Sequence, residues 1–212
     1  MDATVTVTNS ETVGPDTVAI SFETPEGFEA QPGQFVKLSA DIDGDGYARF
    51  YTISSPDMVE DFEVTVEIDP DASGPFSNHL ADLSAGDTIA MSGPFGSDYY
   101  EGEARVVVLA GGPGIGPAVG IGERVINDGG ELAVVYKDDT PAHEDRLAEL
   151  DAAGASVAIT DGDITEAVDA AVTGQEDEQI FVYGFATFLD EATKAIEAAG
   201  VDPDGMKVEN FG

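Results

Sequence analysis

The spacing of apolar residues changes near residue 100, and this change constrains the fold more than any other feature of the sequence. Before it, apolar and polar residues alternate in short segments separated by Gly, Pro and Asp, which predicts strands that are buried on one face. After it, Arg105–Ala110 is a continuous apolar run, typical of a strand buried on both faces of a parallel sheet. We therefore expect two units, residues 1–99 and 100–212, with a boundary near Gly96–Glu103.

The first unit is expected to be all β apart from one short helix near Phe76–Leu83. Short strands at this spacing favour a small antiparallel barrel or sandwich. The expected strands are Thr4–Thr8, Thr17–Glu23, Gln34–Ala40, Arg49–Ser54, Phe62–Asp69 and Thr88–Ser92.

The second unit alternates strands with helices, which predicts a parallel sheet covered on both faces. After Arg105–Ala110, a glycine-rich turn leads into a helix that ends near Asn127. Further strands are expected at Leu132–Tyr136, Ser156–Thr160, Ile180–Tyr183 and Met206–Asn210, and further helices at His143–Leu150, Ile164–Ala171 and Thr187–Ala199.

The turn at Gly111–Pro117 has the character of a phosphate-binding loop. It leaves a buried strand and opens a helix, so its backbone N–H groups lie at the positive end of that helix, which favours an anion. It matches neither G-x-G-x-x-G, because Pro117 takes the third position, nor a P-loop, because it lacks Lys-Ser/Thr. The alternative is a tight turn without a ligand; four glycines in six positions favour the ligand.

Arg49 is one of only eight basic residues in a chain with 43 acids, and it stands in a strand-like segment beside Tyr51 and Thr52. A guanidinium next to an aromatic ring and a hydroxyl suits an anionic, planar ligand. A flavin nucleotide is such a ligand, since its pyrophosphate can accept from the guanidinium fork. The alternative is a surface strand whose arginine balances nearby acids.

Three further segments are candidates for the same site. Gly74–Leu80 could open a short helix with Ser77 near its N-terminus, either as an anion site or as an ordinary cap. Tyr183 and Gly184 end a strand, and ligands of open parallel sheets bind at the carboxyl ends of the strands. Phe211 follows the last expected strand and belongs either at this edge or in the core or an interface.

The net charge of −35 argues against nucleic acid and anionic membranes as partners. Because the acids occur in both halves, we interpret them as the solvated surface of a halophilic protein; a partner with a basic face is the alternative.

The absence of cysteine excludes thiolate catalysis and a cysteine-ligated iron–sulfur cluster, and His79 and His143 lack metal-ligand spacing. No signal peptide or membrane span is visible, so we expect a cytoplasmic protein without a bound metal.

Taken in order, five motifs resemble those of the ferredoxin–NAD(P)H reductase family of flavoenzymes, and together they cover almost the whole chain. They are Pro32-Gly33-Gln34-Phe35, Arg49-Phe50-Tyr51-Thr52, Gly74-x-x-Ser77-x-x-Leu80, Gly93-Pro94-Phe95-Gly96 and Gly111-Gly112-Pro113-Gly114-Ile115-Gly116-Pro117. The resemblance implies an N-terminal antiparallel β-barrel of Greek-key type that binds FAD, followed by an α/β domain that binds NAD(P)H on a parallel sheet.

The resemblance also implies roles. Arg49 is expected to pair with the flavin pyrophosphate, Tyr51 to pack along the flavin ring, and Thr52 to hydrogen-bond near flavin N5, where hydride arrives. Thr52 and Tyr183 are the catalytic candidates; many relatives have a cysteine where this chain has Tyr183, so the family's chemistry at that position is in doubt. The residues implied in cofactor binding are Arg49, Phe50, Tyr51, Thr52, Gly74, Ser77, Gly112, Gly114, Ile115, Gly184 and Phe211.

The implied activity is that of an FAD-dependent NAD(P)H oxidoreductase. It passes hydride between NAD(P)H and FAD, and single electrons to or from a separate acceptor such as a ferredoxin. A free-flavin reductase, or an electron-transfer subunit of a larger complex, is the alternative. Asp138 and Asp139, after the strand expected beside the adenosine ribose, favour NADH over NADPH, whereas Lys137 argues weakly the other way.

Overall fold

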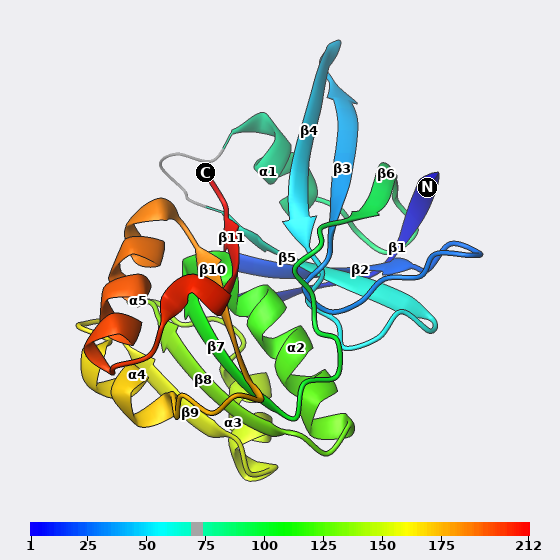
Figure 1. Ribbon diagram of the computed structural model, residues 1–212. Helices are drawn as coiled ribbons and strands as arrows, with labels where there is room; N and C mark the ends of the chain where they lie inside the picture. The colour runs from blue at the N-terminus through cyan, green and yellow to red at the C-terminus, as the bar shows by residue number, and fades with distance from the viewer. Residues whose placement is uncertain (69–73) are drawn as a thin grey trace.

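The computed structural model describes residues 1–68 and 74–212 and shows two units packed side by side (Figure 1). Asp69, the expected last residue of one strand, lies outside the described residues. Residues 96–104 connect the two units, and the division at residues 99 and 100 stays a prediction. The first unit contains β1 (Asp2–Gly14), β2 (Thr17–Glu23), β3 (Phe35–Ile42), β4 (Asp45–Thr52), β5 (Asp61–Glu67), α1 (Pro75–Ala81) and β6 (Thr88–Phe95).

The strands of the first unit form one antiparallel sheet in the order β4-β3-β6-β1-β2-β5. Val36 and Leu38 of β3 are fully buried whereas Lys37 between them is not, as the alternation of apolar residues predicts. A bridge between Ile53 and Val64 brings the two edge strands together, so the sheet curls into a barrel. The insertion of β6 between β3 and β1 gives the non-sequential order of a Greek key, which confirms the predicted fold class.

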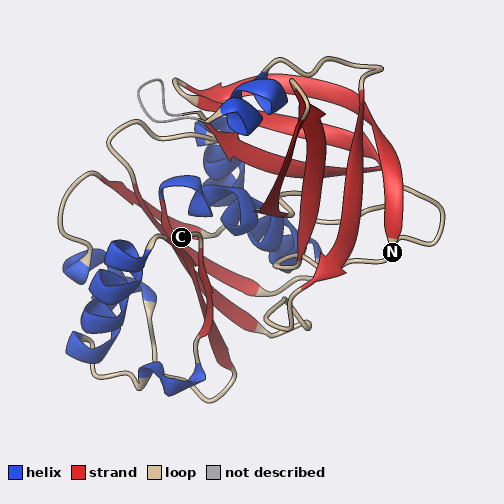
Figure 2. Ribbon diagram, turned by 90° about the horizontal axis from the view of Figure 1, so that it is seen from above, coloured by secondary structure: helices blue, strands red, loops and turns tan. Residues whose placement is uncertain are grey.

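The second unit is a parallel sheet in the order β11-β10-β7-β8-β9. Val106 and Val108 of β7 pack with α2 and α3, whereas Val107 and Leu109 pack with α4 and α5, so helices cover both faces (Figure 2). This two-sided burial accounts for the continuous apolar run. The elements are β7 (Arg105–Gly111), the 3₁₀ turn η1 (Gly112–Gly114), α2 (Ile115–Asn127), β8 (Glu131–Lys137), α3 (Glu144–Ala152), β9 (Ser156–Thr160), α4 (Thr165–Ala171), β10 (Glu178–Gly184), α5 (Ala186–Ala198), the 3₁₀ turn η2 (Pro203–Gly205) and β11 (Lys207–Asn210).

Helix α2 brings the two units together through a face that lacks side chains. A Cβ atom on Gly116 would lie 2.8 Å from the Thr65 Cβ, and one on Gly120 would lie 2.8 Å from the Ser54 carbonyl carbon. Glycine at these two positions therefore allows the start of α2, with the glycine-rich turn before it, to approach the barrel closely.

Arg146 of α3 holds this junction with charge-assisted hydrogen bonds. Its guanidinium donates to Glu63 at 2.8 Å and to the Ser54 carbonyl at 2.7 Å in the first unit, and to Glu123 of α2 at 2.6 and 2.8 Å. The arginine side chain is only 22% exposed, so water screens these contacts weakly. Arg146 thus adds to the packing of α2 a cation that lies between two carboxylates, one from each unit.

Within residues 1–68 and 74–212, no helix is long and apolar enough to cross a membrane. In the same described part of the chain, no group of three or more His, Asp or Glu side chains could hold a metal ion.

Candidate functional site

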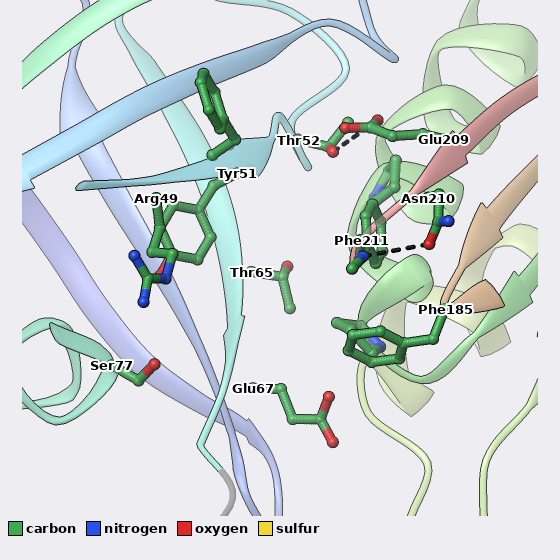
Figure 3. Close-up of a pocket in the computed structure, with 14 residues that line it drawn as sticks. Arg49, Tyr51, Thr52, Thr65, Glu67, Ser77, Phe185, Glu209, Asn210 and Phe211 are labelled. Atoms are coloured by element: carbon green, nitrogen blue, oxygen red, sulfur yellow. Dashed lines mark hydrogen bonds between the residues drawn. The ribbon is translucent and has the colours of Figure 1, made fainter. Parts of the chain in front are cut away.

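A cleft of about 510 Å³ lies between the end of β4 and the residues that follow β11 (Figure 3). This volume falls within the range of small-molecule sites. Arg49, Tyr51 and Ser77 lie on one wall, and Glu209, Asn210 and Phe211 lie on the facing wall. Six of the predicted binding residues line the cleft: Arg49, Phe50, Tyr51, Thr52, Ser77 and Phe211.

Arg49 and Tyr51 are alternate residues of the edge strand β4, so they share one face of it. The exposed Arg49 guanidinium donates to the neighbouring Ala48 carbonyl at 2.8 Å and forms no ion pair with any described residue. Burial raises the pKa of Tyr51 to about 12 against the opposing effects of Arg49 and a hydrogen bond with Ser77. The wall therefore offers a free cation and a neutral aromatic ring side by side.

Thr52, at the end of β4, donates a hydrogen bond to Glu209 of β11 at 2.9 Å. Burial raises the pKa of Glu209 to about 7; the hydrogen bond from Thr52 lowers it, and Asp98 raises it further. A carboxyl with this pKa can hold or release a proton near neutral pH. The Thr52 hydroxyl connects it to the cleft, so the pair is suited to moving a proton at the Thr52 oxygen.

Replacing Glu209 with glutamine is expected to raise the free energy of unfolding relative to wild type at pH 8, with the gain shrinking toward pH 5. The pKa of Glu209 is about 7 in the folded chain against 4.5 for a free side chain, so its favourable contribution is full below pH 4.5 and is lost as pH rises through 7. This shift limits the effect to about 3 kcal/mol. Urea unfolding at several pH values in molar salt would measure it.

Glu197→Gln is the matched control, since it removes the same charge from an exposed position on α5. A stabilisation by Glu209→Gln that did not change with pH would contradict the raised pKa. So would an equal pH dependence in the Glu197 variant.

A second cavity, of about 560 Å³, lies at the carboxyl ends of the parallel strands and adjoins the cleft. Glu67, Pro113 and Phe185 line both spaces. Gly112 lines the second cavity with φ at +54°, a conformation that favours glycine. A Cβ on Gly114 would fall on the Tyr183 carbonyl, so this glycine lets the turn pack against β10. The glycine-rich turn therefore borders the space where a nucleotide phosphate is expected.

Several predicted residues lie near these spaces without lining them. Ile115 is fully buried at the start of α2, and Gly114 and Gly184 support the turn and the end of β10. Gly74 precedes α1 at its N-cap position, outside both linings. Their predicted contacts with a cofactor stay predictions.

Tyr183 lies behind the cleft. Its ring is stacked between those of Phe181 and Phe211, at centroid distances of 6.3 and 6.5 Å, and the side chain is fully buried. The Tyr183 hydroxyl has no hydrogen-bond partner among the described residues, and the residue borders a small cavity of about 170 Å³ that Glu209 also lines. Burial, with Glu209 and Asp98 nearby, raises its pKa well above 10.0. Phe211, rather than Tyr183, forms the cleft surface here, so the catalytic role of Tyr183 stays a prediction.

The sequence analysis missed several residues of the cleft wall: Thr65, Glu67, Phe185, Glu209 and Asn210. Thr65 hydrogen-bonds the Nε2 atom of His143 at 2.9 Å. Burial, with Arg146 nearby, lowers the pKa of His143 to about 3, so that imidazole is neutral at physiological pH. Glu209 and Asn210 directly precede Phe211, and this adjacency was the signal that could have identified them; Thr65 and Glu67 belong to no motif.

Known proteins resemble this chain in sequence and in fold. Residues 4–100 match the family model of the oxidoreductase FAD-binding domain. The toluate 1,2-dioxygenase electron transfer component of Pseudomonas putida is 26% identical over 97% of this chain and 66% of its own length. The chain is similar to the ferredoxin–NADP reductase-like flavoprotein reductases and shares their fold.

Two further matches are to reductases. The glycine betaine monooxygenase reductase subunit of Chromohalobacter salexigens is 38% identical over 50% of this chain and 30% of its own length. A ferredoxin NADP⁺ reductase from Neisseria gonorrhoeae, solved with bound FAD and NADP, shares the fold with a TM-score of 0.80 at 17% identity; the match covers 100% of this chain and 99% of that one. The first curated relatives are longer proteins, of which the matches cover 66%, 33% and 48%.

Proposed function

We propose that this chain is an FAD-dependent oxidoreductase that takes hydride from NADH and passes electrons to a separate acceptor protein. The observation that carries the proposal is the pair of adjoining cavities that share Glu67, Pro113 and Phe185. The wall of one suits a flavin, and the other lies at the strand ends where nucleotides bind in α/β sheets. Two planar ligands seated in them would meet at the shared wall.

The residues of the cleft fit FAD. Arg49 is an exposed cation without a carboxylate partner among the described residues, so its guanidinium is available to bind an anion. The neutral ring of Tyr51 lies beside it, with Ser77 close by at the start of α1. A pyrophosphate held by Arg49 and the first turn of α1 would leave the ring system to lie along Tyr51 toward Thr52.

Bound FAD would supply the chemistry that side chains lack, accepting a hydride and releasing electrons singly. The side chains bind and orient it, and Phe185 and Phe211 cover the facing side of the cleft against water. Thr52 and Glu209 would hold or move a proton at the Thr52 oxygen. Relatives named as an electron transfer component and as a monooxygenase reductase subunit support a separate acceptor protein.

Charge in the second cavity favours NADH. Asp138, Asp139 and Asp161 line it, and its cation, Lys137, donates to both oxygens of Glu191 at 2.7 and 2.8 Å. A 2′-phosphate would therefore meet carboxylates and a lysine that is already neutralised, whereas a free 2′-hydroxyl could donate to a carboxylate.

Anaerobic mixing of the FAD-loaded protein with NADH is expected to bleach the flavin absorbance, with NADPH acting at least about tenfold less efficiently because of this repulsion. Stopped-flow absorbance in high and low salt measures both reactions. Glu191→Gln leaves Lys137 free and is expected to reduce the preference for NADH over NADPH. Glu197→Gln, on the same helix but outside the cavity lining, should leave that preference unchanged. Failure to bind FAD, or bleaching by neither nucleotide, would refute the proposed function, and faster bleaching by NADPH would refute the preference.

A further inference from the structure

Three phenylalanine rings meet on the outer surface of the barrel. The ring of Phe35 in β3 lies 5.5 Å from that of Phe50 in β4 and 5.9 Å from that of Phe95 in β6, and the last two are 6.1 Å apart. Phe50 is 61% exposed and Phe95 is 39% exposed. Single exposed apolar residues are common, but three aromatic rings in mutual contact form a patch that marks an interaction surface. We call Phe35, Phe50, Phe95 and the adjacent Lys37 the aromatic patch.

Lys37 gives this patch a positive charge. It is directly opposite Phe50 in the β3–β4 register and two residues from Phe35, so the three side chains share one face. Five of the eight basic residues form ion pairs within the described part of the chain, and Lys37 is not among them. A free cation among exposed rings, on a protein with a net charge of −35, is complementary to a partner that is itself acidic where it makes contact.

The patch is continuous with the cleft. Phe50 lines the cleft directly, and Phe35 is opposite Thr52 in the same register. Phe35 also borders the small cavity lined by Val208 and Glu209, so the apolar surface reaches β11 of the second unit. A protein seated here would approach the end of the cleft where Thr52 lies, which suits a partner that exchanges electrons.

We propose that the aromatic patch is the docking surface for an acidic one-electron carrier protein, an inference that rests on the proposed function. The rings supply an apolar contact that survives molar salt, and Lys37 pairs with a carboxylate of the carrier. A second copy of this chain is a poorer occupant, because a two-fold contact through the patch would bring Lys37 of both copies into the same interface.

The test uses an acidic [2Fe–2S] ferredoxin as the probe and ferricyanide as a small acceptor that needs no docking surface. Lys37→Glu and Phe95→Ser are expected to raise the Kd of the ferredoxin by calorimetry, and its KM in NADH-driven reduction, by about tenfold. Turnover with ferricyanide should stay within about twofold of wild type, which also shows that the variants fold. Lys194→Glu is the matched control, since Lys194 is an exposed lysine of α5 that likewise forms no ion pair among the described residues.

Ionic strength separates the charge contribution of Lys37 from the apolar contribution of the rings. Raising the ionic strength to about 1 M should shrink the effect of Lys37→Glu and preserve that of Phe95→Ser, because only the charge contact is screened. Ferredoxin binding unchanged by both patch variants, or weakened equally by Lys194→Glu, would overturn the inference. So would ferricyanide reduction without ferredoxin reduction, or a dimer that Phe95→Ser converts to a monomer. Loss of both activities in the wild type would instead refute the proposed function, and the inference with it.

Discussion

Arg49→Ala is expected to weaken FAD binding by about 30- to 100-fold while the free energy of unfolding changes by less than about 0.5 kcal/mol. The binding loss corresponds to about 2–3 kcal/mol, the size of charge-assisted hydrogen bonds from a guanidinium to a pyrophosphate. Folding should be nearly unaffected because the exposed side chain bonds only the adjacent Ala48 carbonyl among the described residues. Fluorescence titration with FAD and urea unfolding of the FAD-free protein measure the two quantities separately.

Arg124→Ala is the control for this experiment, since it removes a partly exposed arginine that pairs with Asp128 one helical turn away. It should leave FAD binding unchanged. Arg49→Lys should give intermediate affinity, because lysine keeps the charge but loses the planar fork of donors. Equal losses of FAD affinity and stability in Arg49→Ala would indicate a structural arginine.

Arg146→Met is expected to lower the free energy of unfolding by about 2–4 kcal/mol, the largest stability effect predicted for this chain. Methionine retains most of the apolar stem but leaves the Glu63 and Glu123 carboxylates facing each other without a cation. The Ser54 carbonyl loses its donor as well. Removing one partner from a poorly solvated ion pair is costly because the remaining charges stay desolvated. Urea unfolding in molar salt, where the acidic surface is screened, would measure the loss.

Two further variants show whether the loss arises from the stranded charges. The triple variant Arg146→Met, Glu63→Gln, Glu123→Gln should recover part of the stability, since it removes both carboxylates. Arg124→Ala should cost less than about 0.5 kcal/mol, as exposed ion pairs generally do. If Arg146→Met and Arg124→Ala had similar effects, Arg146 would not hold the two units together.

The sequence predicts the fold well where the signal is local. Alternation along β3 and the continuous apolar run in β7 report whether a strand has one buried face or two, and the structure confirms both. Strand ends are less certain: the strand expected at Arg49–Ser54 is β4, which runs from Asp45 to Thr52. Its first residues lie in an Asp/Gly-rich segment that resembles a turn, but pairing with β3 extends the strand through it.

The site could be predicted in part. Arg49, Tyr51, Thr52 and Ser77 are prominent because each belongs to a short motif, and the structure gathers them on the cleft wall. Tyr183 was expected beside them, since it ends a parallel strand. The structure places it behind Phe211, because β11 adds beside β10 and carries the C-terminal residues across the edge of the sheet. The position of a strand end in the sequence does not reveal which side chain covers it.

The chain's residues by themselves indicate an antiparallel β unit followed by a parallel sheet, a glycine-rich turn after the first strand of that sheet, and an arginine beside Tyr51 and Thr52. Periodicity, turn chemistry and charge act over a few neighbouring residues, so they can be read along the chain. Only the tertiary structure decides that Thr52 meets Glu209, 157 residues away, that Arg146 joins both units, and that two cavities share a wall. These contacts depend on how closely α2 packs against the barrel. Gly116 and Gly120 allow that approach, but their spacing on one helix face does not reveal which surface packs there.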